Sequence, residues 1–231
     1  MTADDVLADL EAIEHLHGSD RDGGYALAET LCEYQRRMPD DVQHLWDEVL
    51  LTWVRDRADR WWGVATQALA YAGGPAVDEG LAALLRDSAG ELEWRGYVAN
   101  TLIRRGYSSD ELTAEVANAA QARTPMGLTN LAALLRLAPD LLAPAAACVV
   151  TAISSGDLGY VEAHVPPFVH AAADSDPELL VRLVARTEAL DRDAGRRFGR
   201  MVADYLRKPW VREEFPGGVA DGLATRIAGR G

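Results

Sequence analysis

Histidine and cysteine side chains are the groups in this sequence that could bind a metal or transfer a proton. His15 and His17 are two positions apart, which places them on different faces of a helix, and neither an HxxxH nor an HExxH motif occurs. Cys32 and Cys148 lie far apart within apolar stretches, which predicts two unpaired, buried thiols. No glycine-rich phosphate loop and no GxSxG motif is present. The sequence therefore predicts no metal site and no cofactor.

Two further histidines offer a weaker candidate for catalysis. His164 and His170 flank Pro166-Pro167, and Glu162 and Asp174 are near them in the sequence. Imidazole and carboxylate groups that share a pocket can act as general acid and base. An all-α enzyme with a pocket near His164 and His170 is therefore one hypothesis, and ordinary structural roles for both residues are the other. The two prolines also predict a kink or a break in the helix expected over residues 159–173.

Tryptophan is concentrated in one short segment, which contains four of the six tryptophans of the chain. Trp46 and Trp53 belong to a broad apolar stripe that is typical of a buried core helix. Trp61 and Trp62 are adjacent, so on a helix they point about 100° apart and do not both pack easily against one neighbour. Tryptophan and arginine dominate the energetics of protein interfaces. We therefore expect an exposed partner-binding anchor among Arg57, Arg60, Trp61 and Trp62, with packing in the core as the alternative.

Negative charge is concentrated near the N-terminus. The chain carries 36 Asp and Glu against 23 Lys and Arg, a net charge of -13 with a pI near 4.8, and residues 1–50 account for -10 of it. Such a field repels nucleic acid and anionic membranes and attracts a protein with a basic face. The residues expected to bind this partner are Asp40, Asp41, Asp47 and Glu48. The alternative is that these acids form a solvated face that confers solubility.

The elements that position these residues are all predicted to be helices. Apolar residues recur at three- and four-residue spacings, and no segment shows the alternation typical of a strand. From Pro39 onward, breaks recur roughly every 15–19 residues, which predicts about twelve helices in one elongated domain over residues 1–231. Ser109 is expected to cap a helix N-terminus, and Gly106 and Gly156 are expected to end helices.

The N-terminal segment is acidic and has no basic region followed by an apolar run, so we expect no signal peptide. The longest apolar stretch, residues 141–153, is shorter than the roughly 20 residues that span a membrane. We therefore expect a chain located in the cytoplasm.

Residues 65–106, ATQALAYAGGPAVDEGLAALLRDSAGELEWRGYVANTLIRRG, resemble a repeat of the HEAT type. Repeats of this family carry an aspartate in the turn between two helices and an arginine in the second helix. The resemblance implies that Asp87 and Arg95 are structural residues that join the turns of neighbouring repeats. It also implies a right-handed α-solenoid of stacked antiparallel helix pairs, and an irregular helical bundle is the alternative fold.

Together these features favour a protein without enzymatic activity that binds another protein. A specific form of this hypothesis is an immunity or antitoxin-like protein, or a regulatory protein, that covers the basic surface of its partner. The all-α enzyme is the second hypothesis. A helical-repeat DNA-repair enzyme of the glycosylase type would need a basic groove, which the net charge of -13 disfavours.

Overall fold

The computed structural model describes residues 29–30, 32–33, 36–37, 40–57, 62–71, 73–87 and 92–229. The helices with described bounds lie within residues 40–229 and comprise twelve α-helices and two short 3₁₀ helices; no described residue is in a strand, which confirms the all-α prediction for the described part of the chain. The chain divides into two compact units, unit 1 (Met1–Tyr107) and unit 2 (Ser108–Gly231). Each unit is described by itself, and one continuous domain over residues 1–231 stays a prediction.

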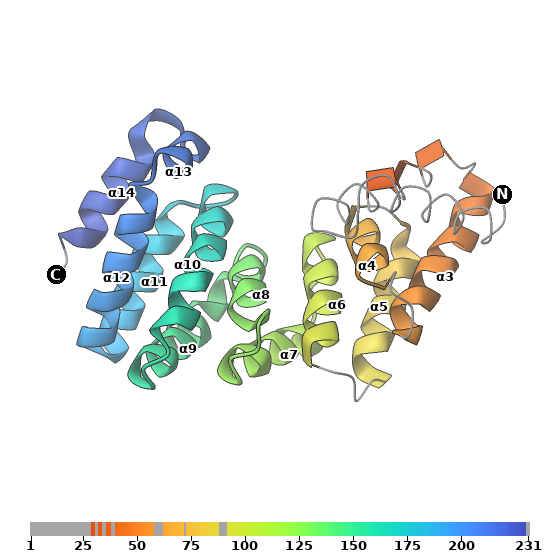
Figure 1. The fold of residues 1–231 in the computed structure, drawn as a ribbon, viewed down its shortest axis with the longest axis horizontal. Helices are drawn as coiled ribbons and strands as arrows, with labels where there is room; N and C mark the ends of the chain where they lie inside the picture. The colour runs from red at the N-terminus through yellow and green to blue at the C-terminus, as the bar shows by residue number, and fades with distance from the viewer. Residues whose placement is uncertain are drawn as a thin grey trace. The chain divides into compact units, whose positions relative to one another are not determined.

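The helices of unit 1 whose bounds are described are α3 (Asp40–Asp56), α4 (Trp62–Tyr71), α5 (Pro75–Asp87) and α6 (Leu92–Arg104). Helix α3 packs against α4 and α5, and α6 packs against the same two helices (Figure 1). Trp46 and Trp53 are buried and meet edge to face at 6.1 Å between ring centroids, which confirms that this part of α3 is a core helix. The Trp94 indole donates a hydrogen bond of 2.8 Å to the Val54 carbonyl near the end of α3.

An arginine holds the turn between α4 and α5. The Arg105 guanidinium, just after α6, donates hydrogen bonds to the carbonyls of Leu69 (2.8 Å), Gly74 (3.0 Å) and Gly73 (3.2 Å). Its Nε also pairs with the carboxylate of Asp78 in α5. Helix-terminal carbonyls have no partner within their own helix, so an arginine from a neighbouring helix can satisfy several of them at once. Arg105 therefore connects three helices of unit 1.

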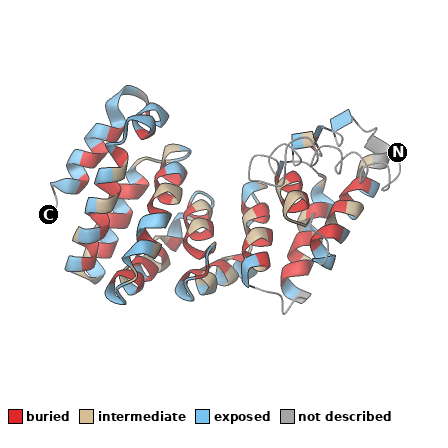
Figure 2. Cartoon of the chain, in the orientation of Figure 1, coloured by how far each residue is buried: buried red, intermediate tan, exposed pale blue. Residues whose placement is uncertain are grey.

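The helices of unit 2 are α7 (Asp110–Gln121), α8 (Gly127–Leu134), α9 (Leu142–Ser154), α10 (Leu158–Ala173), α11 (Glu178–Leu190), α12 (Arg192–Leu206), α13 (Pro209–Glu214) and α14 (Val219–Ala228). The 3₁₀ helices are η1 (Pro139–Leu141) and η2 (Pro216–Gly218). Each helix packs mainly against the next one or two along the chain, such as α9 against α11 and α12 against α14. Figure 2 shows the buried residues of these helices on the sides that face one another.

Two glycines allow helices of unit 2 to approach backbone to backbone. A Cβ atom on Gly195 of α12 would lie 2.5 Å from the backbone nitrogen and Cα of Glu188 in α11. A Cβ on Gly127, the first residue of α8, would lie 2.6 Å from the carbonyl oxygen of Ala119 in α7. Both distances are shorter than any normal carbon contact, so these positions require glycine.

The helix ends follow the predictions from sequence. The Ser109 hydroxyl accepts a hydrogen bond of 3.1 Å from the Leu112 amide and caps α7. Gly106 and Gly156, which follow α6 and α9, have positive φ values of 80° and 81°. The left-handed conformation is open to glycine at no steric cost, so the three predicted helix ends are confirmed.

The predicted break at Pro166-Pro167 is wrong, because α10 continues without interruption from Leu158 to Ala173. The prolines remove the amide groups that would pair with the carbonyls of Glu162 and Ala163. Both of those residues are exposed, so water can satisfy their carbonyls. The φ of proline is itself compatible with a helix, and the flanking core residues Val165 and Phe168 keep the segment packed.

The two cysteines are buried and unpaired, as the sequence predicted. Burial raises the pKa of both thiols, which lowers the thiolate fraction at neutral pH. None of the described helices is both long and apolar enough to span a membrane.

We expect Cys32 and Cys148 to react with Ellman's reagent at pH 8 only after the chain is denatured, because attack requires an accessible thiolate. Addition of dithiothreitol should leave the melting temperature unchanged. Rapid labelling of one thiol in the native protein, or a lower melting temperature after reduction, would contradict this result.

Candidate functional site

Helix α3 has a buried face and an exposed face. Leu45, Glu48, Thr52 and Asp56 follow one another at helical spacing, and all four are exposed. Leu45 is 52% exposed, although it is a large apolar side chain on a helix whose other face enters the core. An exposed leucine can supply an apolar contact to a protein partner, and Glu48 lies one helical turn from it. We call Leu45, Glu48, Thr52 and Asp56 the α3 face.

The acidic residues predicted to bind a partner have different environments. Glu48 is exposed, as expected. Asp40 and Asp41 form the first turn of α3, but their side chains lie outside the described residues. Asp47 requires a correction, because it is only 5% exposed and its carboxylate accepts a hydrogen bond of 3.1 Å from the Gly74 amide. Asp47 holds the turn between α4 and α5 and is not available to a partner.

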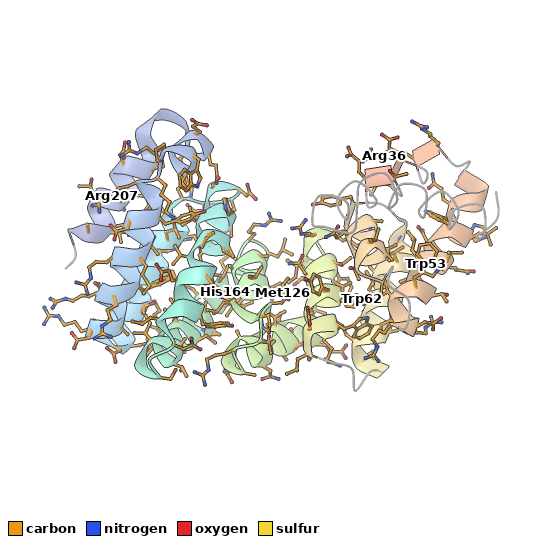
Figure 3. All side chains as sticks on the ribbon, viewed as in Figure 1. Arg36, Trp53, Trp62, Met126, His164 and Arg207 are labelled. Atoms are coloured by element: carbon orange, nitrogen blue, oxygen red, sulfur yellow. The ribbon has the colours of Figure 1, made fainter. Side chains whose placement is uncertain are left out.

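The predicted aromatic anchor is partly described. The exposed Arg57 follows α3 in the left-handed conformation (φ 47°), and its guanidinium lies 4.5 Å from the ring centroid of Trp94. Trp62, labelled in Figure 3, is half-buried and meets Tyr97 edge to face at 5.4 Å between centroids. Arg57 and Trp62 therefore contact two residues of α6 that are one turn apart. Arg60 and Trp61 lie outside the described residues.

The structural pair implied by the repeat resemblance is only partly visible. Asp87 ends α5, and its side chain lies outside the described residues, while Arg95 is half-buried in α6. The structural role implied for Asp87 and Arg95, joining the turns of neighbouring repeats, stays a prediction. Arg105, which no sequence pattern singled out, donates to carbonyls at the turn between α4 and α5. The available signal was the Arg104-Arg105 pair before Gly106, which does not tell which arginine points inward.

His164 has a structural environment. The ring is buried, with Nδ1 at 2.6 Å from the Tyr160 carbonyl and Nε2 at 3.0 Å from the Pro125 carbonyl. The Tyr160 hydroxyl donates a hydrogen bond of 3.0 Å to the Thr124 carbonyl, and burial raises the pKa of Tyr160 and keeps this donor protonated. Both residues thus attach α10 to the turn before α8. In Figure 3, His164 points toward the region of Met126 in this turn.

The structure does not bring the other members of the predicted catalytic pocket to His164. His170 is exposed, and its Nδ1 lies 2.6 Å from a carboxylate oxygen of Glu214 in α13. Asp174 pairs instead with Arg136 at 3.2 Å. No group of three or more histidine, cysteine or acidic residues in the described part of the chain is arranged to hold a metal ion. The described geometry therefore gives no support to a pocket built on His164 and His170.

Comparisons of this chain with protein-family models, with curated proteins and with solved structures find no match.

Proposed function

We propose that this chain binds another protein through the α3 face and that the partner presents a basic surface. The observation that carries the proposal is the exposed Leu45 with the exposed Glu48 one helical turn away, in a chain whose first fifty residues carry a net charge of -10. Leucine supplies an apolar contact that can be desolvated, and the carboxylates favour a cationic partner over an anionic one. Asp40 and Asp41 add to the same negative charge.

The fold that we propose to support this surface is a HEAT-like array of stacked helix pairs. The packing of each helix against near neighbours along the chain supports this arrangement. In such an array the buried polar groups connect helices, as Arg105, Asp47 and His164 do, and the exposed faces remain free for binding. An immunity or antitoxin-like protein, or a regulatory protein, would use the surface in this way.

The charge is expected to act mainly on the rate of encounter. Exposed charges interact over about a Debye length, ~8 Å at physiological salt, so they attract a basic partner before contact is made. Short-range contacts in the interface then act mainly on the dissociation rate. We propose the cytoplasm as the compartment, where two free thiols such as Cys32 and Cys148 persist without pairing.

The test is charge reversal at the two acids of the α3 face, Glu48 and Asp56, together with Asp40 and Asp41 of the first turn of α3. We expect the quadruple variant Asp40→Lys, Asp41→Lys, Glu48→Lys and Asp56→Lys to associate roughly tenfold more slowly than the natural chain at low salt. The partner is first isolated with the tagged natural chain and purified, and association is then followed by stopped-flow fluorescence. The difference should shrink as salt is raised, because screening removes the attraction.

The matched control reverses exposed acids elsewhere, at Asp110, Asp140, Glu162 and Asp204, and changes the net charge by the same amount. This variant should keep most of the natural association rate, and His170→Ala should leave binding unchanged. Equal rates for both quadruple variants would show that only net charge matters. An unchanged rate in the α3-face variant would refute the proposed surface.

A further inference from the structure

Unit 2 contains a groove formed by α11, α12 and α14. The groove has a volume of about 660 Å³ and is lined by Glu188, Asp193, Arg196, Arg197, Arg200 and Ile227, among others. Its floor lies where α12 contacts both neighbours: a Cβ on Gly199 would be 3.2 Å from Val184 of α11 and 3.4 Å from Ile227 of α14. Gly199 therefore lets α12 pack closely against both neighbours at the groove that it lines. We call this feature the α12 groove.

Four other arginines in this part of unit 2 are paired with carboxylates. Arg226 makes two hydrogen bonds to Glu178, of 2.5 and 2.7 Å, and holds the pKa of that carboxyl below its usual range. Arg182, Arg207 and Arg212 pair with Asp176, Asp204 and Asp221, respectively. These four guanidinium groups are therefore already neutralised by a carboxylate of this chain.

The three arginines of the α12 groove differ from these. Within the described residues, Arg196, Arg197 and Arg200 make no hydrogen bond or ion pair, although Glu188 and Asp193 line the same groove. Arg196 and Arg200 are one helical turn apart and Arg197 is adjacent, so three guanidinium groups gather at one end of unit 2. Like charges at this spacing repel one another, and an anion placed among them would relieve the repulsion.

The surrounding sequence strengthens the positive potential. Residues 181–231 carry eleven Lys and Arg against seven Asp and Glu, a net charge of +4 on a chain whose total is -13. The α12 groove therefore lies in the basic segment of an acidic protein, and local charge favours an anionic ligand there.

The other residues that line the groove indicate which class of anionic ligand fits it. Glu188 and Asp193 repel a dense polyanion, and the acidic remainder of the chain repels a long nucleic acid that extends beyond the groove. A short acidic peptide lowers both costs, because its carboxylates are separated by neutral backbone and do not extend beyond the groove. The methylene groups of its glutamate side chains can pack against Ile227, and its backbone amides can donate to Glu188 or Asp193.

We propose that the α12 groove binds a short acidic peptide segment of a partner protein. Arg196, Arg197 and Arg200 donate forked hydrogen bonds to its Asp and Glu carboxylates, a geometry for which guanidinium groups are suited. This goes beyond the function proposed for the α3 face, since it concerns another unit and a ligand of opposite charge. The two surfaces can therefore serve two different partners.

The experiment uses fluorescein-labelled hexaglutamate as the probe and measures fluorescence polarisation at low salt with the full chain. We expect saturable binding that weakens as salt is added. In the variant Arg196→Gln, Arg200→Gln, affinity should fall at least roughly tenfold, because two charge-assisted contacts are lost. The matched control, Arg182→Gln, Arg207→Gln, changes the net charge equally and should retain affinity to within about twofold.

Labelled hexalysine and a single-stranded DNA hexamer serve as competing probes, and circular dichroism verifies that both variants are folded. Equal losses of hexaglutamate affinity in the groove variant and the control would overturn the proposal, since binding would then follow net charge alone. Tighter binding of the DNA hexamer than of hexaglutamate would also overturn it and would identify the groove as a nucleic-acid site. Neither result depends on the α3 face, which all of these variants leave intact.

Discussion

Replacing Arg105 with methionine is expected to lower the free energy of unfolding of unit 1 by about 3 kcal/mol. Methionine keeps most of the length of the side chain but removes the guanidinium. The carbonyls of Leu69, Gly73 and Gly74 then lose a donor, and the partly buried Asp78 carboxylate loses its charge partner. Leaving several such groups without partners costs more than the contacts themselves contribute.

Urea denaturation followed by tryptophan fluorescence measures this effect, because Trp210 is the only one of the six tryptophans that belongs to unit 2. The control is Arg104→Met at the neighbouring position, where the exposed guanidinium contacts Tyr71. That change should cost less than about 1 kcal/mol. Equal destabilisation by the two substitutions would show that Arg105 does not hold the turn between α4 and α5.

Replacing Gly195 with alanine is expected to destabilise unit 2 by about 3 kcal/mol. The new methyl group would lie 2.5 Å from backbone atoms of Glu188, so α12 must move away from α11. A backbone contact of this kind is not relieved by a change of rotamer, unlike a contact with a flexible side chain. The packing of Val184 and Phe198 in the same helix pair would be disturbed as well.

Gly222→Ala in α14 is the matched control, because no atom lies within 4 Å of the Cβ that it introduces. The same chemical change should there stabilise the helix by about 0.5–1 kcal/mol, since alanine is the better helix former. Thermal unfolding followed by circular dichroism compares the two variants. A melting temperature for Gly195→Ala that equals or exceeds that of the natural chain would refute the close approach of α11 and α12.

Local features of the sequence predicted local features of the structure. Helical periodicity predicted the all-helical fold of the described residues, Ser109 and Gly106 marked helix ends, and the positions of Cys32 and Cys148 in apolar stretches predicted burial. Each of these predicted features depends on residues that are close together in the sequence. The break at Pro166-Pro167 was predicted wrongly, because the packing of α10 outweighs a local preference.

Long-range contacts were not predictable in this way. Asp47 has the same sequence context as its exposed neighbour Glu48, but its carboxylate reaches an amide 27 positions away at Gly74. Arg105 contacts a carbonyl 36 positions away at Leu69. Such partners are set by how the helices pack, and helix packing is not encoded in spacing along one segment.

The α12 groove could likewise be predicted only in part, because its lining depends on contacts between residues far apart in the sequence. Counting charge in windows along the chain would have found the basic segment over residues 181–231. The sequence does not show which arginines of that segment are paired, because Glu178, the partner of Arg226, is 48 positions away. The sequence likewise suggested a shared pocket for His164 and His170, although α10 directs the two rings to different parts of unit 2.

The packing of unit 2 also bears on how it folds. Its main helix contacts join elements no more than three helices apart, as α9 and α12 or α11 and α14 do. Contacts between residues close in sequence close only short loops and therefore have a small entropic cost, so the rate of folding should be high, in the microsecond-to-millisecond range of helical proteins with low contact order. Folding can begin at any adjacent helix pair and extend in both directions, and the helices made first during synthesis can fold before α14 has left the ribosome.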